Sequence, residues 1–213
     1  MSTTLNKYPS FDLSEIIPEN AFVYKIYQPL KPVKTGDSVT GFSLNAGYKR
    51  LRRFYNGAEI HGSVLSDELS QKPLVISFYS KYWREAGLRQ LAQLNAMQND
   101  IRANGGNLLI ISAENDENLS EIAWQNNLSL SFYHDADNEV ALKFSVYSEG
   151  DPTWSRFSGI DVNVPLPATY VIGLSKQIVY DNVERDYTDK LLPGGIISTV
   201  YGASLIKNNR RSA

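Results

Sequence analysis

The feature that most constrains this chain is a pair of short apolar runs separated by one helix-length segment. The runs are residues 74–79 and 107–112. An apolar run of this length without polar alternation is typical of a strand covered on both faces. Between the runs, residues 85–104 place leucine, methionine and isoleucine at helical spacing, and Gly105-Gly106 marks the end. The segment therefore predicts two parallel strands joined by a crossover helix.

The rest of the pattern extends this unit into a larger α/β arrangement. The later elements are predicted as a helix at 118–127, a strand at 130–133, a helix at 139–144, a hairpin of 168–173 and 177–182, and a helix at 193–206. Before the unit, strands are predicted at 21–27 and 39–44, and Asn56-Gly57 predicts the turn of a hairpin over 52–60. The sequence thus predicts a mixed central sheet flanked by helices.

The length and the position of the prolines indicate one domain with short appendages. A chain of 213 residues suits a single core without metals or disulfides. Residues 1–35 hold four of the nine prolines, which predicts a strand-containing N-terminal extension. Residues 36–207 form the predicted α/β domain, and residues 208–213 a short basic tail.

Composition excludes several classes of function. With no cysteine, the chain offers no disulfide, zinc–thiolate site or nucleophilic thiol. The formal net charge is −2, which does not favour nucleic acid or an anionic membrane as a partner. No apolar stretch is long enough to span a bilayer or to act as a signal peptide, so the sequence predicts a cytoplasmic protein. No glycine-rich phosphate loop or serine-hydrolase elbow is present, and no cofactor is predicted.

Five segments, in order, resemble the peroxiredoxin-like family of alkyl hydroperoxide reductases and thiol-specific antioxidants. They are an opening Gly-Asp-x-x-x-x-Phe-x-Leu stretch at 36–44, a Phe-Tyr strand end and turn at 78–87, an Asp-x-x-x-x-x-Ala turn at 135–141, a Pro-x-Thr-Tyr-Val-Ile strand at 167–172, and an Asp-Tyr-x-x-Lys element at 186–190. The resemblance implies a thioredoxin-like fold.

At every position that carries peroxide chemistry in that family, this chain has a different residue. The resemblance places the family's proline at Ser80, its threonine or first cysteine at Arg84, its peroxidatic cysteine at Gly87 and its late arginine at Lys190. A peroxidatic thiolate attacks the O–O bond, and neither glycine nor arginine supplies such a nucleophile. We therefore expect a degenerate active-site turn that retains only the strand, the turn and the start of a helix.

Two interpretations of that turn stay open. In one, Lys81 and Arg84 hold a small phosphate or carboxylate at the start of the helix, with Pro167 and Lys190 nearby. In the other, both cations are solvated and the turn has no ligand. Trp83 is expected to pack at the helix start rather than to stack a ligand. By resemblance, Pro167 corresponds to the cis-proline that faces the active site in thioredoxin-like proteins.

Two acidic segments invite a functional interpretation and a simpler structural one. Asp135 and Asp137 beside His134 are metal-ligand types, but Asp-x-Asp at a turn is more often cap chemistry, and no metal is predicted. The loop 114–117, Glu-Asn-Asp-Glu, precedes a predicted helix and is interpreted as its N-terminal cap.

These observations predict a catalytically degenerate peroxiredoxin-like protein that serves as a binding or assembly module. The alternative is a repurposed enzyme or small-anion-binding protein that uses Lys81 and Arg84, although no general base with a supporting partner is visible. The resemblance also implies a homodimer. The predicted strand 21–27 is apolar on both faces and needs cover from its own domain or from a partner.

Overall fold

The computed structural model describes residues 29–39, 50–60, 69, 71–184 and 191–209. The predicted strand at 21–27 and most of that at 39–44 lie outside these residues. The strands are β1 (Leu51–Tyr55), β2 (Ala58–Glu59), β3 (Leu74–Phe78), β4 (Asn107–Ser112), β5 (Ser131–His134), β6 (Ala168–Ile172) and β7 (Ile178–Val183). The helices are α2 (Arg84–Ala103), α3 (Asp116–Gln125), α4 (Glu139–Lys143) and α5 (Pro193–Asn209). Both predicted runs of the central crossover are therefore confirmed as strands.

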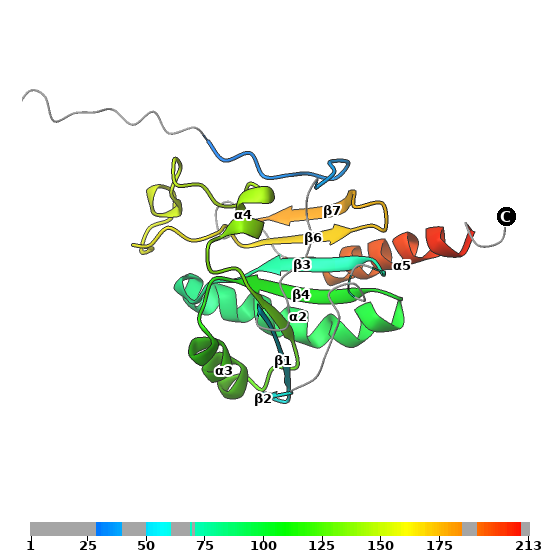
Figure 1. Cartoon of the computed structure of the whole chain (residues 1–213), viewed down its shortest axis with the longest axis horizontal. Helices are drawn as coiled ribbons and strands as arrows, with labels where there is room; N and C mark the ends of the chain where they lie inside the picture. Colours follow the sequence, from blue (N-terminus) through cyan, green and yellow to red (C-terminus); the bar gives the residue numbers. More distant parts are fainter. Residues whose placement is uncertain (1–28, 40–49, 61–68, 70, 185–190, 210–213) are drawn as a thin grey trace, which may run out of the picture.

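The described strands form one mixed sheet in the order β2-β1-β5-β4-β3-β6-β7, with β3 near its centre (Figure 1). β3 pairs in parallel with β4, and β4 pairs in parallel with β5. β6 runs antiparallel to β3, and β7 antiparallel to β6. This is the mixed sheet that the alternating pattern predicts. The antiparallel pairing of β1 with β5 was not predicted.

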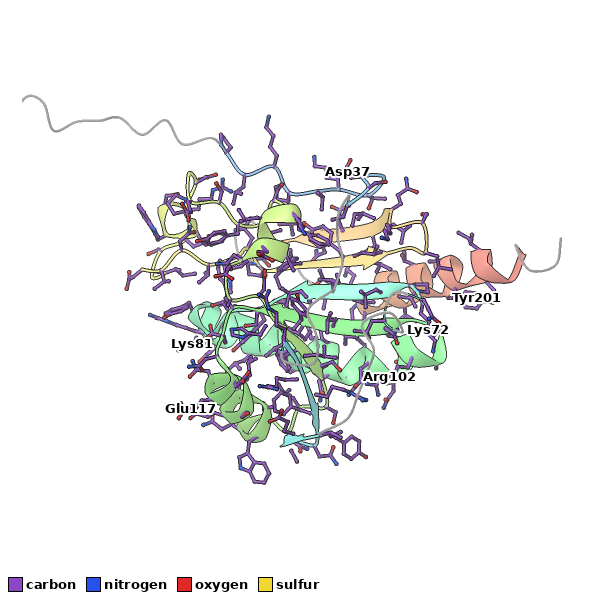
Figure 2. All side chains as sticks on the ribbon, in the orientation of Figure 1. Asp37, Lys72, Lys81, Arg102, Glu117 and Tyr201 are labelled. Carbon is purple, nitrogen blue, oxygen red and sulfur yellow. The ribbon has the colours of Figure 1, made fainter. Side chains whose placement is uncertain are left out.

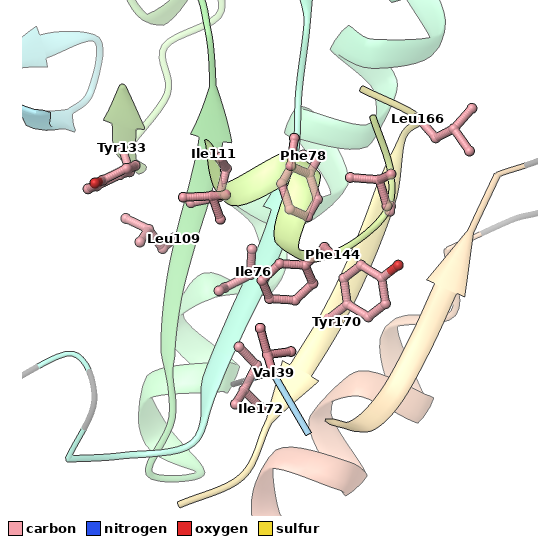
Figure 3. Packing of buried hydrophobic residues seen from close by; sticks show 14 of the residues in the cluster. Val39, Ile76, Phe78, Leu109, Ile111, Tyr133, Phe144, Leu166, Tyr170 and Ile172 are labelled. Carbon is pink, nitrogen blue, oxygen red and sulfur yellow. The ribbon is translucent and has the colours of Figure 1, made fainter. Parts of the chain in front are cut away.

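Each face of the sheet has its own apolar core, which explains why β3 is apolar without alternation. On one face, Ile76 and Phe78 pack with Phe144 of α4 and Tyr170 of β6, as the close view in Figure 3 shows. The rings of Phe78 and Phe144 meet edge to face at 5.4 Å between centroids. On the other face, Val75 belongs to a second apolar core that includes side chains of α2, α3 and α5. All five β3 side chains are consequently buried.

The hairpin of β1 and β2 turns at the pair that the sequence singled out. Asn56 has φ 47° and Gly57 φ 80°, the left-handed geometry of a two-residue turn. A Cβ on Gly57 would lie 3.0 Å from the carbonyl oxygen of Ala123, so the turn rests directly on α3. The hairpin prediction is confirmed.

Several element ends differ from the prediction. α3 begins at Asp116 rather than residue 118, because Asn115 caps it by accepting a hydrogen bond from the Asn118 amide at 2.9 Å. α5 continues to Asn209, three residues beyond the predicted end at 206. A 3₁₀ helix at Thr153–Ser155 lies in a segment for which the sequence predicted no element.

Residues 29–39 run along the start of β7 and join it to the loop that follows α4. The Gly36 amide donates to the Ile178 carbonyl at 2.9 Å, and the Ile178 amide donates to the Asp37 carbonyl at 2.8 Å. The Leu30 amide donates to the buried Asp151 carboxylate at 2.7 Å, and Arg156 forms an ion pair with Asp151. These contacts cover the beginning of one sheet edge. Among the described helices, none is long and apolar enough to cross a membrane.

Candidate functional site

Five of the predicted site residues lie in one turn between β3 and α2, here called the site turn and defined as residues 80–87: Ser80, Lys81, Trp83, Arg84 and Gly87. After Tyr79, Ser80 caps a 3₁₀ helix of Lys81–Trp83, and its hydroxyl accepts a hydrogen bond from the Tyr82 amide at 3.3 Å. α2 follows directly from Arg84. The turn therefore lies at the carboxyl end of a central strand, where open α/β sheets commonly bind ligands.

Gly87, the position that the resemblance gives to the peroxidatic cysteine, has close neighbours on the side where a side chain would begin. A Cβ there would lie 3.0 Å from Cε2 of Tyr79, 3.1 Å from Cβ of Trp83 and 3.2 Å from the Ser80 carbonyl oxygen. Ordinary contacts of a Cβ begin near 3.4 Å. Gly87 itself is buried in the first turn of α2. A side chain at this position would therefore require its neighbours to shift by a few tenths of an ångström.

Aromatic side chains fill the interior of the site turn. Trp83 is 3% exposed, donates its indole N–H to the Pro165 carbonyl at 2.9 Å and meets Phe157 edge to face at 5.0 Å. It packs at the start of the helix as predicted. Tyr79 is also buried, and this burial raises the pKa of its hydroxyl, with a smaller contribution from the charge of Glu114. The hydroxyl of Tyr79 therefore stays protonated at neutral pH.

Glu114, which the sequence predicts only as part of a helix cap, contacts the site turn. Its side chain is 7% exposed, at the end of β4 beside the site turn. It accepts hydrogen bonds from the Ser80 hydroxyl at 3.1 Å and from the Lys81 amide at 3.0 Å. The Asn118 amide group approaches it at 3.4 Å. A carboxylate is thus built into the turn at the place where an anion-binding site would present amides.

The two cations of the site turn differ in their surroundings. The Lys81 ammonium lies 3.7 Å from the Glu114 carboxylate and 5.6 Å from the centre of the Tyr82 ring. Arg84 is exposed, and its backbone adopts φ 49° and ψ −130°, which residues with a side chain rarely do. Lys81 stands exposed at one end of the molecule (Figure 2). A hollow of about 320 Å³ opens beside it, lined among others by Asn138.

Comparison with known proteins gives the family. The model of the AhpC/TSA family matches residues 36–181. The chain belongs to the AhpC/TSA family. Because it has no cysteine, the thiol chemistry of peroxidases in this family is not available to it. No match was found among curated proteins.

Solved structures share the AhpC/TSA fold with this chain at low sequence identity. A PrxQ mutant from Xylella fastidiosa is 16% identical, with TM-score 0.56, over 86% of this chain and 99% of that chain. The reduced 2-Cys peroxiredoxin from Plasmodium vivax is 14% identical, with TM-score 0.56, over 84% and 85%. AhpC from Mycobacterium tuberculosis is 12% identical, with TM-score 0.55, over 79% and 97%. These likenesses show the thioredoxin-like fold that the motifs implied.

The structure of this AhpC/TSA chain describes one of the two remaining predicted ligand residues, Pro167, but not the other, Lys190. Pro167 is buried just before β6, and its carbonyl accepts the Glu184 amide at 2.9 Å. No cis peptide bond occurs among the described residues, so the expectation of a cis-proline is wrong. The trans form is the default for X–Pro bonds, and here the chain enters β6 without the cis bend. Lys190 lies outside the described residues.

The acidic segments act mainly as caps. Asp135 is buried, and its carboxylate accepts the Val140 amide at 3.0 Å and the Ala141 amide at 3.1 Å at the start of α4. This is the cap chemistry that the sequence favoured over a metal. No three acidic or histidine side chains in the described part of the chain are placed to hold a metal ion. In the loop 114–117, Asn115 caps α3, whereas Glu114 turns inward to the site turn.

Proposed function

We propose that this chain is a catalytically degenerate member of the AhpC/TSA family that works as a binding or assembly module. The observation that carries the proposal is the packing around Gly87. The position that would hold the nucleophile is closed by Tyr79, Trp83 and the Ser80 carbonyl, all within 3.2 Å of a Cβ placed there. A turn kept for peroxide chemistry would keep this space open.

The electrostatics of the site turn support the same proposal. A peroxidatic site stabilises negative charge as the thiolate attacks and hydroxide leaves. Here the buried Glu114 carboxylate occupies the Ser80 hydroxyl and the Lys81 amide. The strand, the helix start and the tryptophan remain, but two donors of the turn, the Ser80 hydroxyl and the Lys81 amide, already bind a carboxylate. The rigid unit of strand, turn and helix, with its surface, is what the chain retains for binding or assembly.

Self-association, as a homodimer in the cytoplasm, is part of this proposal. The strand that the sequence predicts at 21–27 is apolar on both faces and would need cover on both sides, which a second copy could supply. Light scattering across a dilution series tests it, since one chain has a mass of 23.9 kDa. A mass twice that, lost when residues 1–28 are removed, supports the dimer. A single-chain mass at all concentrations refutes it. This truncation spares the contacts of Leu30 and Gly36 with the domain.

The second candidate is a small-anion site at Lys81 and Arg84, completed by Pro167 and Lys190. The observation in its favour is the hollow of about 320 Å³ that Lys81 lines, although Arg84 and Pro167 do not line it and the Glu114 carboxylate does. Thermal unfolding with inorganic phosphate and with acetate tests it. A phosphate-dependent rise in melting temperature that Arg84→Ala removes, and that Arg89→Ala keeps, supports the anion site. Arg89 is the matched control, because it is an exposed arginine on the same helix with its own partner, Glu85.

A further inference from the structure

A hollow of about 800 Å³ lies between residues 29–37, here called the strap, and the segment that joins α4 to β6. The strap is the blue segment above β7 in Figure 1. The volume lies within the roughly 300–1,000 Å³ that is typical of small-molecule sites. The described residues that line the hollow include none of the site turn and none that line the smaller hollow at Lys81. What this hollow binds is therefore independent of what the site turn does.

A buried carboxylate holds the two sides of the hollow in place. Asp151 is 4% exposed, and its carboxylate accepts the Leu30 amide of the strap at 2.7 Å. The same carboxylate accepts Nε of Arg156 at 3.3 Å and forms an ion pair with that guanidinium. A buried charge requires partners of this kind. Asp151 therefore fixes the strap on one side of the hollow and a guanidinium on the other.

The charges around the hollow leave positive charge available to a ligand. The cations that line it are Lys31, Lys34 and Arg156, and the carboxylates are Asp37 and Asp151. Both carboxylates have partners, because Asp151 pairs with Arg156 and Asp37 accepts the Lys34 backbone amide at 2.8 Å. Within the described part of the chain, the ammonium groups of Lys31 and Lys34 form no ion pair. Both are exposed, so an anion in the hollow can reach them.

The rest of the lining is apolar. The strap contributes Pro29, Leu30 and Pro32, and Leu166 lies on the opposite side. Proline has no backbone N–H, so this part of the strap offers few donors to a polar ligand. An inorganic anion would use the two lysines but leave these side chains in contact with water. An uncharged apolar molecule would cover the side chains but leave the lysines without a partner. A molecule with both an anionic group and an apolar body matches the whole lining.

We infer that this hollow binds a small organic carboxylate, with its anionic group at Lys31 and Lys34 and its apolar body against Leu30, Pro32 and Leu166. The hollow adds a ligand site to the proposed binding module and does not depend on the loss of peroxide chemistry. An aliphatic and an aromatic carboxylate share this chemistry, and both are therefore used as probes.

Isothermal titration calorimetry of the full-length protein tests the inference with four probes. Octanoate and 2-naphthoate carry both features, acetate carries the charge with almost no apolar body, and 2-naphthalenemethanol carries the apolar body without the charge. At least one of the two larger carboxylates should bind saturably, about tenfold or more tightly than acetate and the alcohol. Its affinity should fall as salt is raised, because the lysines are exposed. The preference between octanoate and 2-naphthoate identifies the kind of apolar body.

A charge variant locates the site on the strap. Lys31→Gln/Lys34→Gln should bind the preferred carboxylate about tenfold more weakly and should lose most of the salt dependence. Lys72→Gln/Arg102→Gln is the matched control, because both residues are exposed and neither lines the hollow, and it should bind as the wild type does. Urea titration should give both variants the midpoint of the wild type, since neither pair of side chains forms an ion pair with another described residue.

Four results would overturn the inference. The first is no saturable binding of either larger carboxylate, and the second is acetate binding as tightly as both of them, which would indicate attraction of any anion. The third is an equal loss of affinity in the two double variants. The fourth is binding that appears only after residues 1–28 are removed, because the chain's own N-terminal segment would then occupy the hollow in the full-length protein.

Discussion

The free energy of unfolding of the Gly87→Ala variant distinguishes a closed site turn from an open one. Gly87 lies in the first turn of α2, where alanine is favoured over glycine by about 1 kcal/mol in helix propensity. In this chain the new methyl group would lie 3.0 Å from the Tyr79 ring, 3.1 Å from Trp83 Cβ and 3.2 Å from the Ser80 carbonyl oxygen. Two of these neighbours are buried aromatic residues and the third is backbone, so none can move aside easily. Overpacking of this kind costs about 1–3 kcal/mol.

The expected net effect of Gly87→Ala is therefore a loss of about 1 kcal/mol in the free energy of unfolding. Urea titration followed by circular dichroism measures it as a lower midpoint at an unchanged slope. Gly202→Ala is the matched control, because Gly202 is exposed in α5 and a Cβ there meets nothing within 4 Å. That control should gain about 0.5–1 kcal/mol. A gain of similar size in Gly87→Ala would refute the closed turn.

Three further changes follow from the same region. Glu114→Gln should lower the free energy of unfolding by about 1–3 kcal/mol, because its carbonyl can replace the oxygen that accepts from Ser80 and the Lys81 amide, but its N–H₂ then faces the Asn118 amide group and the Lys81 ammonium; an unchanged urea midpoint contradicts this. Arg84→Gly should raise it by about 1 kcal/mol by relieving the strained backbone at φ 49°, and a lower melting temperature argues against such strain. Burial raises the pKa of the Asp135 carboxyl, so its stabilising contribution is complete below the ordinary pKa and is lost as pH rises through the folded pKa. The stability of the wild type relative to Asp135→Asn should therefore fall as the pH rises above the ordinary aspartate pKa of about 4, and urea titrations that show a constant difference count against this.

The fold was accessible from the sequence where local patterns decide the structure. The apolar run at 74–79 had to be a covered strand, and it is buried on both faces because Ile76 faces one core and Val75 the other. Asn56-Gly57 had to turn, since both residues tolerate positive φ. The pairing of β1 with β5 was not accessible, because a strand's neighbour in the sheet depends on contacts distant in sequence.

The sequence predicted where the candidate site lies, but it did not predict which side chains bind the groups of the turn. The motif order located Ser80, Arg84 and Gly87 in one turn, and the structure brings them together there. Glu114 was interpreted as part of a cap because it precedes a helix. Its inward turn depends on the parallel pairing of β3 and β4, which sets the loops after the two strands side by side. The position of Glu114 beside the site turn could have been predicted from two adjacent parallel strands that are each followed by polar residues.

The position of Gly87 also determines how an introduced thiol should behave. The chain has no cysteine, so a single substitution creates its only thiol. In Gly87→Cys the sulfur would be enclosed by Tyr79 and Trp83, and it should react with a thiol reagent far more slowly than in Ser198→Cys, whose site on α5 is exposed. Equal reaction rates in the two variants would show that the turn opens freely.

Peroxide consumption by the purified wild-type protein tests the central claim most directly. The assay follows hydrogen peroxide over time with dithiothreitol as reductant, with and without protein. A chain with no thiol and a closed site turn should leave the rate at that of the protein-free reaction at every protein concentration. Saturable peroxide loss that rises in proportion to the protein, and that heat denaturation abolishes, would contradict the account.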